Sequence, residues 1–371
     1  MRTLVYIIGT GPGAPGLITT RGQRCLNTAD VVIYDRTVPP RVLDLAPPRA
    51  ERIDVGRPAR EATDQDAISY LLAEKAREGK VVARLKLGDP FLFDRGGEEA
   101  LFLHEQGIPF EVVPGVPSAI GASAYAGIPI TYPGGGDTVT FVRGFDDDGR
   151  ERPRLDWDHL AGLGGTMVCN AGPKQLPKMI EALVAHGRPA DESAAIIVNG
   201  TLSSQRTITG TLAELAKAVE ETPVGAAILI VGRVVNFREH LRWFDSRPLF
   251  GRRALVMHSK DQPDDLAALL EQQGAAVSLD TDAGIDVYRQ LLDRKVDVVT
   301  FTSASAVLGF LASVGADQAS DLLAHTVVAT LGPAAADAVT RANVTPAIQL
   351  PGGSLAAFAD AISAHFAPLA P

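Results

Sequence analysis

Four short apolar runs in the first third of the chain each lead into a loop of turn-forming or acidic residues. The first run, residues 4–8, ends at Gly9 and is typical of a strand buried on both faces. Helical stretches separate the runs, so the alternation predicts a mostly parallel sheet with helices on both faces. Ligands of such sheets bind beyond the carboxyl ends of the strands. The loops expected at one site are residues 9–13, Asp35, residues 88–90 and residues 114–119.

Two further α/β regions are expected downstream. Residues 134–153, rich in Gly, Asp and Arg, indicate a domain boundary or an exposed loop, and residues 243–251 are the best linker candidate. The length of 371 residues is itself suited to two or three domains. The predicted fold class is therefore α/β throughout. The predicted domains are residues 1–135, 136–245 and 246–371.

Composition excludes several classes of protein. A net charge of −9 argues against a nucleic-acid partner, because phosphate binding needs clustered Lys and Arg. Cys25 and Cys169 are the two cysteines, so neither a disulfide framework nor a Cys/His metal site is expected. The apolar start of the chain is too short for a signal peptide or membrane span. We therefore expect a soluble cytoplasmic protein without a metal.

The first two loops have both a functional and a structural interpretation. Residues 9–13 match a dinucleotide-binding fingerprint poorly, because Pro12 and Pro15 stand where a helix should open. The alternative there is a plain tight turn. Asp35 can act as a general base or orient a cation, or it can merely cap the next turn.

The third loop, residues 88–99, is the densest in chemistry. Asp89 can accept a hydrogen bond from the ribose or amino group of a nucleoside. Phe91 and Phe93 can close over a flat group, although the commoner fate of Phe is the core. Glu98 and Glu99 follow two glycines and suit the first turn of a helix.

Taken together, these segments resemble the uroporphyrinogen-III C-methyltransferases of the tetrapyrrole methylase family. The resemblance covers about residues 3–244 in the family's order and includes the later run NGTLSSQRTITGTL. It implies two α/β domains with S-adenosylmethionine in the cleft between them, and a homodimer. It also implies methylation of uroporphyrinogen III at C2 and C7, giving precorrin-2 for siroheme or cobalamin.

The resemblance also assigns roles to individual residues. Asp35 matches the proposed proton acceptor, and Arg57 stands in place of the family's proton-donor lysine. The positions that match cofactor contacts are Pro12, Leu87, Gly88, Asp89, Leu92, Pro117, Ser118, Ala171 and Gly200.

Several of these positions depart from the family pattern. Leu87 replaces a glycine, Ala171 replaces a methionine, and Asp94 stands where Gly is usual. Pro117-Ser118 replaces Thr-Ala, and Tyr132 replaces a histidine. Arginine holds anions but is a poor proton donor, so Arg57 is suited to binding an anion. We hypothesise a divergent, functional methyltransferase. The alternatives are a methylase of another precorrin and a non-catalytic tetrapyrrole-binding protein.

The substrate that the resemblance implies is a polycarboxylate. An acidic protein must then gather arginines locally at its cleft. The candidates are Arg36, Arg57, Arg60 and Arg95, each of which can also be a solvated surface charge.

From residue 247 onward the chain resembles uroporphyrinogen-III synthase. That enzyme has two similar lobes with the active site between them, and only one lobe's length remains here. The favoured interpretation is a vestigial or scaffolding domain. The positions that match its binding loops are Thr302, Ser303, Ser305, Gly332 and Pro333.

Overall fold

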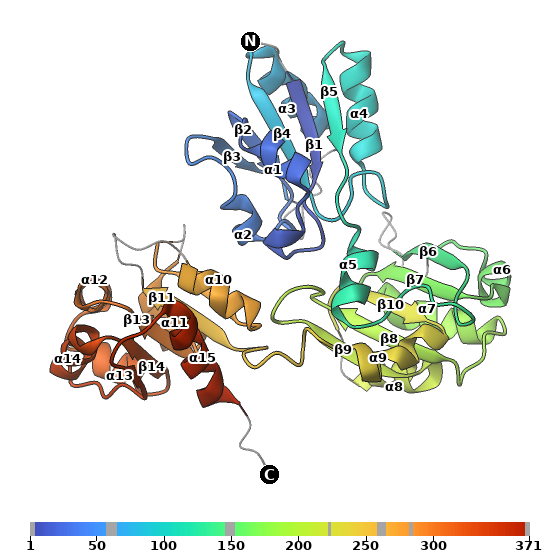
Figure 1. The fold of residues 1–371 in the computed structure, drawn as a ribbon. Helices are drawn as coiled ribbons and strands as arrows, with labels where there is room; N and C mark the ends of the chain where they lie inside the picture. The colour runs from blue at the N-terminus through green and yellow to red at the C-terminus, as the bar shows by residue number, and fades with distance from the viewer. Residues whose placement is uncertain are drawn as a thin grey trace. The chain divides into compact units, whose positions relative to one another are not determined.

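The computed structural model describes residues 4–56, 65–144, 153–221, 224–257, 265–281 and 285–367. The chain divides into two compact units, Met1–Arg242 and Trp243–Pro371, and each is described by itself (Figure 1). Unit 1 holds two sheets and unit 2 holds one. The linker predicted at residues 243–251 begins where the second unit begins.

The first sheet of unit 1 is entirely parallel, in the order β3-β2-β4-β1-β5. One face packs against the helices that precede and follow β2, and the other against α3 and α4. This is the predicted doubly covered parallel sheet. The elements are β1 (Leu4–Gly9), η1 (Pro15–Leu17), α1 (Thr20–Leu26), β2 (Val31–Tyr34), α2 (Pro40–Leu43), β3 (Glu51–Asp54), α3 (Gln65–Arg77), β4 (Val81–Lys86), α4 (Gly96–Glu105) and β5 (Phe110–Val113).

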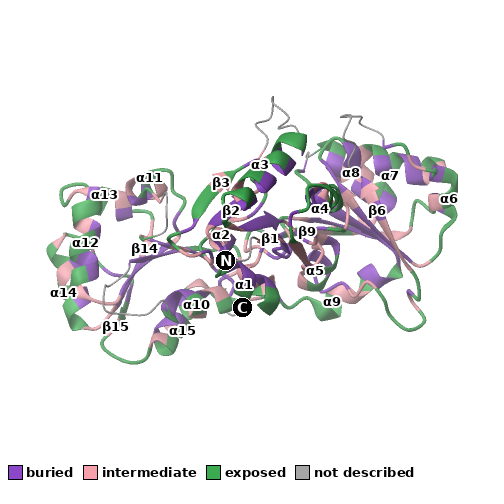
Figure 2. Ribbon diagram, turned by 90° about the horizontal axis from the view of Figure 1, so that it is seen from above, coloured by how far each residue is buried: buried purple, intermediate pink, exposed green. Residues whose placement is uncertain are grey.

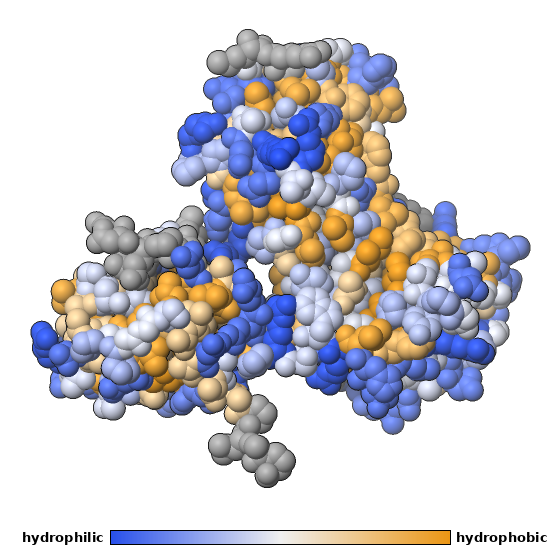
Figure 3. All heavy atoms as spheres, viewed as in Figure 1, coloured by the Kyte–Doolittle hydropathy of each residue, from blue (hydrophilic) through white to orange (hydrophobic). Residues whose placement is uncertain are grey.

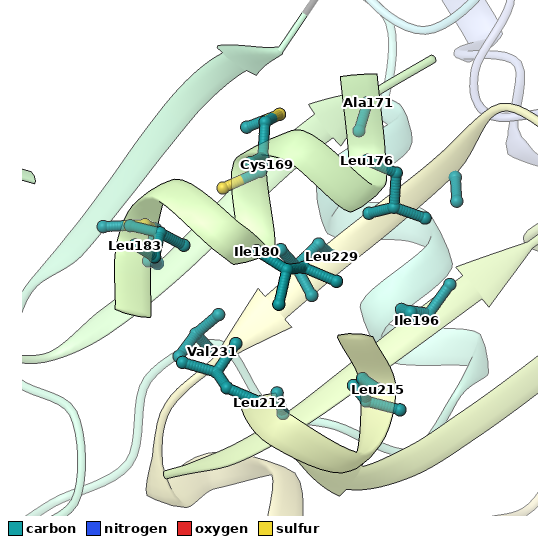
Figure 4. Close-up of a cluster of buried hydrophobic side chains, with 14 of the residues drawn as sticks. Cys169, Ala171, Leu176, Ile180, Leu183, Ile196, Leu212, Leu215, Leu229 and Val231 are labelled. Atoms are coloured by element: carbon teal, nitrogen blue, oxygen red, sulfur yellow. The ribbon is translucent and has the colours of Figure 1, made fainter. Parts of the chain in front are cut away.

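The second sheet of unit 1 is mixed, in the order β6-β7-β10-β8-β9, with only β6 and β7 parallel to each other. One face forms a core with α7 and α8 (Figure 4), and α5 packs on the other. The elements are α5 (Ser118–Tyr125), β6 (Val139–Gly144), α6 (Trp157–Gly162), β7 (Thr166–Ala171), α7 (Gln175–Ala185), β8 (Ser193–Val198), β9 (Arg206–Thr211), α8 (Leu212–Glu221), β10 (Ala227–Val231), η2 (Arg233–Phe237) and α9 (Arg238–Leu241).

Unit 2 contains one parallel sheet, in the order β12-β11-β13-β14-β15. Helices α10 and α15 cover one face, and α11 to α14 cover the other. The elements are β11 (Arg253–Met257), α10 (Asp265–Gln272), β12 (Ala276–Leu279), α11 (Val287–Leu292), β13 (Val298–Phe301), α12 (Ala304–Val314), α13 (Ala319–Leu323), β14 (Val327–Leu331), α14 (Pro333–Arg341), β15 (Ile348–Leu350) and α15 (Leu355–Phe366).

Burial follows these layers. The strands are largely buried and the outer helix faces are exposed (Figure 2). Hydrophilic residues are spread over the visible faces of both units (Figure 3). Among the described residues, no helix combines the length and the apolarity that crossing a membrane requires.

Candidate active site

Three of the predicted loops meet at the carboxyl ends of neighbouring strands β4, β1 and β5. Gly11 and Gly88 exchange two backbone hydrogen bonds, of 3.2 and 2.7 Å. A Cβ atom on Gly9 would lie 2.5 Å from the amide nitrogen of Gly115. Only glycine allows backbones to approach so closely, which explains why turn residues collect at these strand ends. The three loops therefore form one rigid floor.

Asp89 ties this floor together. Its Oδ1 accepts from the amide of Phe91 at 2.9 Å, and its Oδ2 accepts from the amide of Gly115 at 3.0 Å. Each of these two oxygens has a second lone pair that can accept another hydrogen bond. The contact predicted between Asp89 and a nucleoside stays a prediction, and the side chain has in addition a structural role that the sequence did not reveal.

The loop after β1 also contacts the second domain of unit 1. The amide of Ala14 donates to the hydroxyl of Thr201 at 3.1 Å. Thr201 is buried and has a φ of 71°, a strained backbone conformation that often marks a functional loop. A Cβ atom on Gly200 would overlap Ala122 of α5. Gly200 is thus held beside α5, within the same unit as the glycine floor.

Pro12, Pro117 and Ser118 belong to the same neighbourhood. Pro12 is buried against Gly121 of α5, where any side chain would overlap its ring. Pro117 and Ser118 begin α5, and a Cβ atom on Gly88 would lie 3.2 Å from the hydroxyl oxygen of Ser118. The structure therefore brings together most of the predicted cofactor contacts.

Three predicted residues are placed differently. Leu87 and Leu92 flank the floor and are half-buried. Ala171 ends β7, and its side chain is fully buried in the core under α7 (Figure 4). Successive strand residues face opposite sides, so Ala171 points away from the α5 side. Any ligand contact by Ala171 would have to come from its backbone.

Phe91 and Phe93 differ in how far they are exposed. Phe91 is 60% exposed, so the alternative of a core residue is wrong for it. Phe93 is half-buried and has a φ of 59°. Because the Phe91 ring is exposed, it can stack on a flat group of a ligand.

A buried cluster of charge lies beneath Asp35. Arg84 and Lys86 alternate with leucines along β4 and are 1% and 2% exposed. Both donate to one oxygen of the fully buried Glu99 of α4, at 3.1 Å, and Gln65 of α3 donates to the same oxygen. Arg84 Nη2 also donates to Asp35 Oδ1 at 2.7 Å. Asp35, 27% exposed, is therefore held in a fixed orientation by a buried guanidinium.

Opposing effects act on Glu99. Burial alone would raise the pKa of its carboxyl, but the charges and hydrogen bonds of Arg84 and Lys86 hold that pKa below its ordinary value. Burial would likewise lower the pKa of Arg84, but Glu99 and Asp35 outweigh it and raise that pKa. Both groups stay charged in the folded protein.

The sequence analysis missed this cluster. The sequence did contain an indication of it. Arg84 and Lys86 are two residues apart in an apolar strand, so both side chains point to the same buried face. Buried charges need partners, so the pattern requires an acid nearby. Nothing in the sequence said that Glu99 would be that acid.

Two of the candidate substrate-binding arginines, Arg36 and Arg95, form ion pairs outside the cluster. Arg36 is mostly exposed and 4.0 Å from Asp54, and Arg95 pairs with Glu98 at 2.6 Å. Arg57 and Arg60 lie outside the described residues.

In unit 2 the predicted loop residues also follow strand ends. Ser303 caps α12, and its hydroxyl lies 2.9 Å from that of Ser305. Thr302 follows β13, and Gly332 and Pro333 follow β14 and open α14. A parallel sheet places these loops at one edge.

A parallel sheet with a glycine floor, joined to a mixed sheet whose loop contacts that floor, defines a two-domain α/β protein with its site at the strand ends. The family model described as Tetrapyrrole (Corrin/Porphyrin) Methylases matches residues 4–216. The chain belongs to this family. A second model, Uroporphyrinogen-III synthase HemD, matches residues 242–351.

Named relatives agree with this assignment. A siroheme synthase of Pseudomonas fluorescens is 49% identical over 243 residues, which is 65% of this chain and 52% of that protein. An S-adenosyl-L-methionine-dependent uroporphyrinogen III methyltransferase of Methanosarcina barkeri is 46% identical over 239 residues, 64% of this chain and 94% of that protein. The chain spans about half the length of the siroheme synthases it matches.

A solved structure supports the fold. Uroporphyrin-III C-methyltransferase from Thermus thermophilus, complexed with S-adenyl homocysteine, is 36% identical with a TM-score of 0.55. The match covers 64% of this chain and 99% of that one.

Proposed function

We propose that this chain transfers methyl groups from S-adenosylmethionine to C2 and C7 of uroporphyrinogen III, giving precorrin-2 for siroheme or cobalamin. The observation that carries the proposal is Asp35, partly exposed and fixed by the buried Arg84, in the same domain as the glycine floor. The Methanosarcina barkeri relative, named for this reaction, supports it over nearly its whole length.

The residues fit the proposed cofactor. The loops around Gly9, Gly88 and Gly115 pack backbone against backbone, which fixes one surface at the strand ends for the cofactor to lie on. Phe91 offers an exposed aromatic ring beside it. The residues proposed to hold the cofactor are Pro12, Leu87, Gly88, Asp89, Leu92, Pro117, Ser118, Gly200 and, through its backbone, Ala171.

The protein's task is alignment and removal of a proton. S-adenosylmethionine, when bound, supplies an electrophilic methyl group on a good leaving group. The rigid floor and α5 orient the reactants, which converts an encounter into an intramolecular step. After transfer the pyrrole ring carries a positive charge, and Asp35 accepts the proton whose loss neutralises it. Arg84 keeps the Asp35 carboxylate aimed while it does so.

Substrate carboxylates require cations at the rim. Arg36 and Arg95 are accessible for this purpose, and they form ion pairs with Asp54 and Glu98 respectively. Arg57 is proposed to bind anions there instead of donating a proton.

A methyl-transfer assay with uroporphyrinogen III and mass spectrometry of the product tests the proposal. We expect a gain of two methyl groups. Activity on another precorrin alone would favour the first alternative, and no turnover on any tetrapyrrole would favour a binding protein. Calorimetric titration with S-adenosylmethionine that detected no binding would contradict the proposal at its first step.

Two finer points are proposed from the family resemblance. The chain is expected to act as a homodimer in the cytoplasm, with uroporphyrinogen III as its small-molecule partner. Sedimentation analysis and cell fractionation check these points.

For unit 2 we propose a scaffolding role without synthase activity, because one parallel sheet offers only one wall of a two-lobed site. Incubation with hydroxymethylbilane tests this. Clear formation of uroporphyrinogen III would contradict it.

A further inference from the structure

Asp94 is a second carboxylate at the edge of the buried charge cluster. It lies just before Arg95, the N-cap of α4. Its Oδ1 accepts from the Arg95 amide at 2.6 Å and from Lys86 Nζ at 2.9 Å. Within the described residues both of its bonds end on Oδ1, and the side chain is 25% exposed. Oδ1 is therefore the atom of Asp94 that faces the Lys86 ammonium, and Oδ2 has no hydrogen-bond partner among the described residues.

Lys86 links Asp94 to Asp35. Its Nζ lies 2.9 Å from Asp94 Oδ1 and 4.0 Å from Asp35 Oδ2, and Glu99 anchors it at 3.1 Å. The lysine is buried, whereas both aspartates are partly exposed. A movement of about 1 Å brings the ammonium within hydrogen-bond distance of Asp35. One buried ammonium thus stands between two accessible carboxylates.

The charges of the cluster do not balance. Among the described residues, three carboxylates, Asp35, Asp94 and Glu99, face two cations, Arg84 and Lys86. Like charges at close range favour uptake of a proton by one member. Arg84 is committed to Glu99 and Asp35, so Lys86 is the side-chain partner of Asp94 in the part of the chain that the structure describes.

The pKa values of Asp94 and Glu99 are shifted in opposite directions. Burial raises the pKa of Asp94 above its ordinary value; Lys86 and the Arg95 amide oppose this, and the negative charge of Asp35 adds to it. The pKa of Glu99 is instead held low by Arg84 and Lys86, in spite of its burial. Of these two acids, Asp94 is therefore the one that binds a proton more readily.

We propose that Asp94 is the proton outlet of this site: it receives, through Lys86, the proton that Asp35 removes from the methylated substrate. The inference rests on the proposed methyl transfer. Lys86 gives one proton to Asp94 as it takes one from Asp35, so the ammonium is unchanged. Asp35 becomes a carboxylate again and Asp94 a neutral acid, which passes its proton to water. This step readies Asp35 for the second methyl group.

The Asp94→Asn variant tests this assignment. Asparagine keeps an oxygen for the Arg95 amide and Lys86 but does not accept a proton in this range. We expect the first methyl group to be transferred at the wild-type rate in rapid-quench experiments. Steady-state turnover is expected to fall about 100-fold, giving a burst of one methyl per site. A steady-state rate equal to that of the wild type, or a first transfer as slow as later ones, would overturn the inference.

Two further variants sharpen the test. Asp94→Gly leaves room for an added carboxylate, so formate is expected to restore its steady-state rate where chloride does not. Failure of formate to do so counts against the inference. Glu105→Gln, which removes an exposed carboxylate at the far end of α4, is the matched control and should behave as the wild type.

An infrared pH titration separates this inference from the proposed function. The wild-type protein should show a protonated carboxyl band at a pH above the ordinary range of aspartate, and Asp94→Asn should lack it. If the band is present but the wild type transfers no methyl group, the proposed function fails alone. If methyl transfer is seen without the band, the outlet assignment fails alone.

Discussion

The first sheet of unit 1 and the sheet of unit 2 have the same architecture but different interiors. Both have five parallel strands, and both place helices on the two faces. The middle strand of the first, β4, carries the buried Arg84 and Lys86. The middle strand of the other, β13, carries a single buried polar side chain, Thr300, among apolar residues.

This difference indicates where function lies. Burying ion pairs is seldom the cheapest route to stability, because desolvation can exceed the attraction between the charges. A strand whose only role is packing is therefore expected to carry mainly apolar side chains, as β13 does. The buried charge of Arg84 in β4, which orients Asp35, is therefore best explained by a role in the reaction.

Removal of Arg84 is expected to have the largest effect. Arg84→Met leaves Glu99 and Asp35 without their guanidinium, and breaking a buried pair costs roughly 3–5 kcal/mol. Hydrogen exchange should show loss of protection in β4 and unchanged protection in β13. Unchanged protection in β4 would break the contrast between the two sheets.

Asp35→Asn is expected to act on the reaction and leave stability nearly unchanged. The amide keeps an oxygen for Arg84 but is no base, so turnover should fall by about 100-fold or more. Initial rates and thermal melting measured on the same preparation check this. Loss of folding together with activity would show that Asp35 is structural.

Unit 1 should be the more sensitive to acid. A carboxyl whose folded pKa is lowered contributes stability above its unfolded pKa, and that stability is lost as pH falls towards the folded value. The lowered pKa of Glu99 places this loss below the ordinary pKa of Glu, about 4.3. Exchange protection of β4, followed from pH 6 down to pH 3, should fall in the wild type. In Glu99→Gln it should be weaker at pH 6 and depend less on pH.

The smallest effects are expected in unit 2. Asp297, whose pKa is lowered through its hydrogen bonds to Arg253 in spite of its burial, forms a largely solvated pair at 2.9 Å. Asp297→Asn should cost at most about 1 kcal/mol in chemical denaturation. Thr300→Val should be neutral or slightly stabilising, because among the described residues its buried hydroxyl has no partner. A large loss of stability in either variant would contradict the expectation that buried polar groups matter more in β4 than in unit 2.

Much of the fold followed from local patterns. The first parallel sheet follows from apolar runs that end in turn residues. Edge strands β3 and β9 escaped prediction, because their exposed, polar residues lack a continuous apolar run. The loop predicted at residues 114–119 overlaps the start of α5, at Ser118 and Ala119.

The sequence by itself determined the glycine-bearing loops, the alternation of most strands and helices, and the family resemblance. These depend on backbone conformation and on side-chain periods of two or 3.6 residues, which are local properties. Only the tertiary structure decided that Asp89 bonds to Gly115, that Ala171 lies in a core and that Phe91 lies outside one. It also decided that α4 lays Glu99 across Arg84 and Lys86. Those contacts join segments far apart in the chain, and helix-on-sheet packing, not sequence spacing, sets which side chains meet.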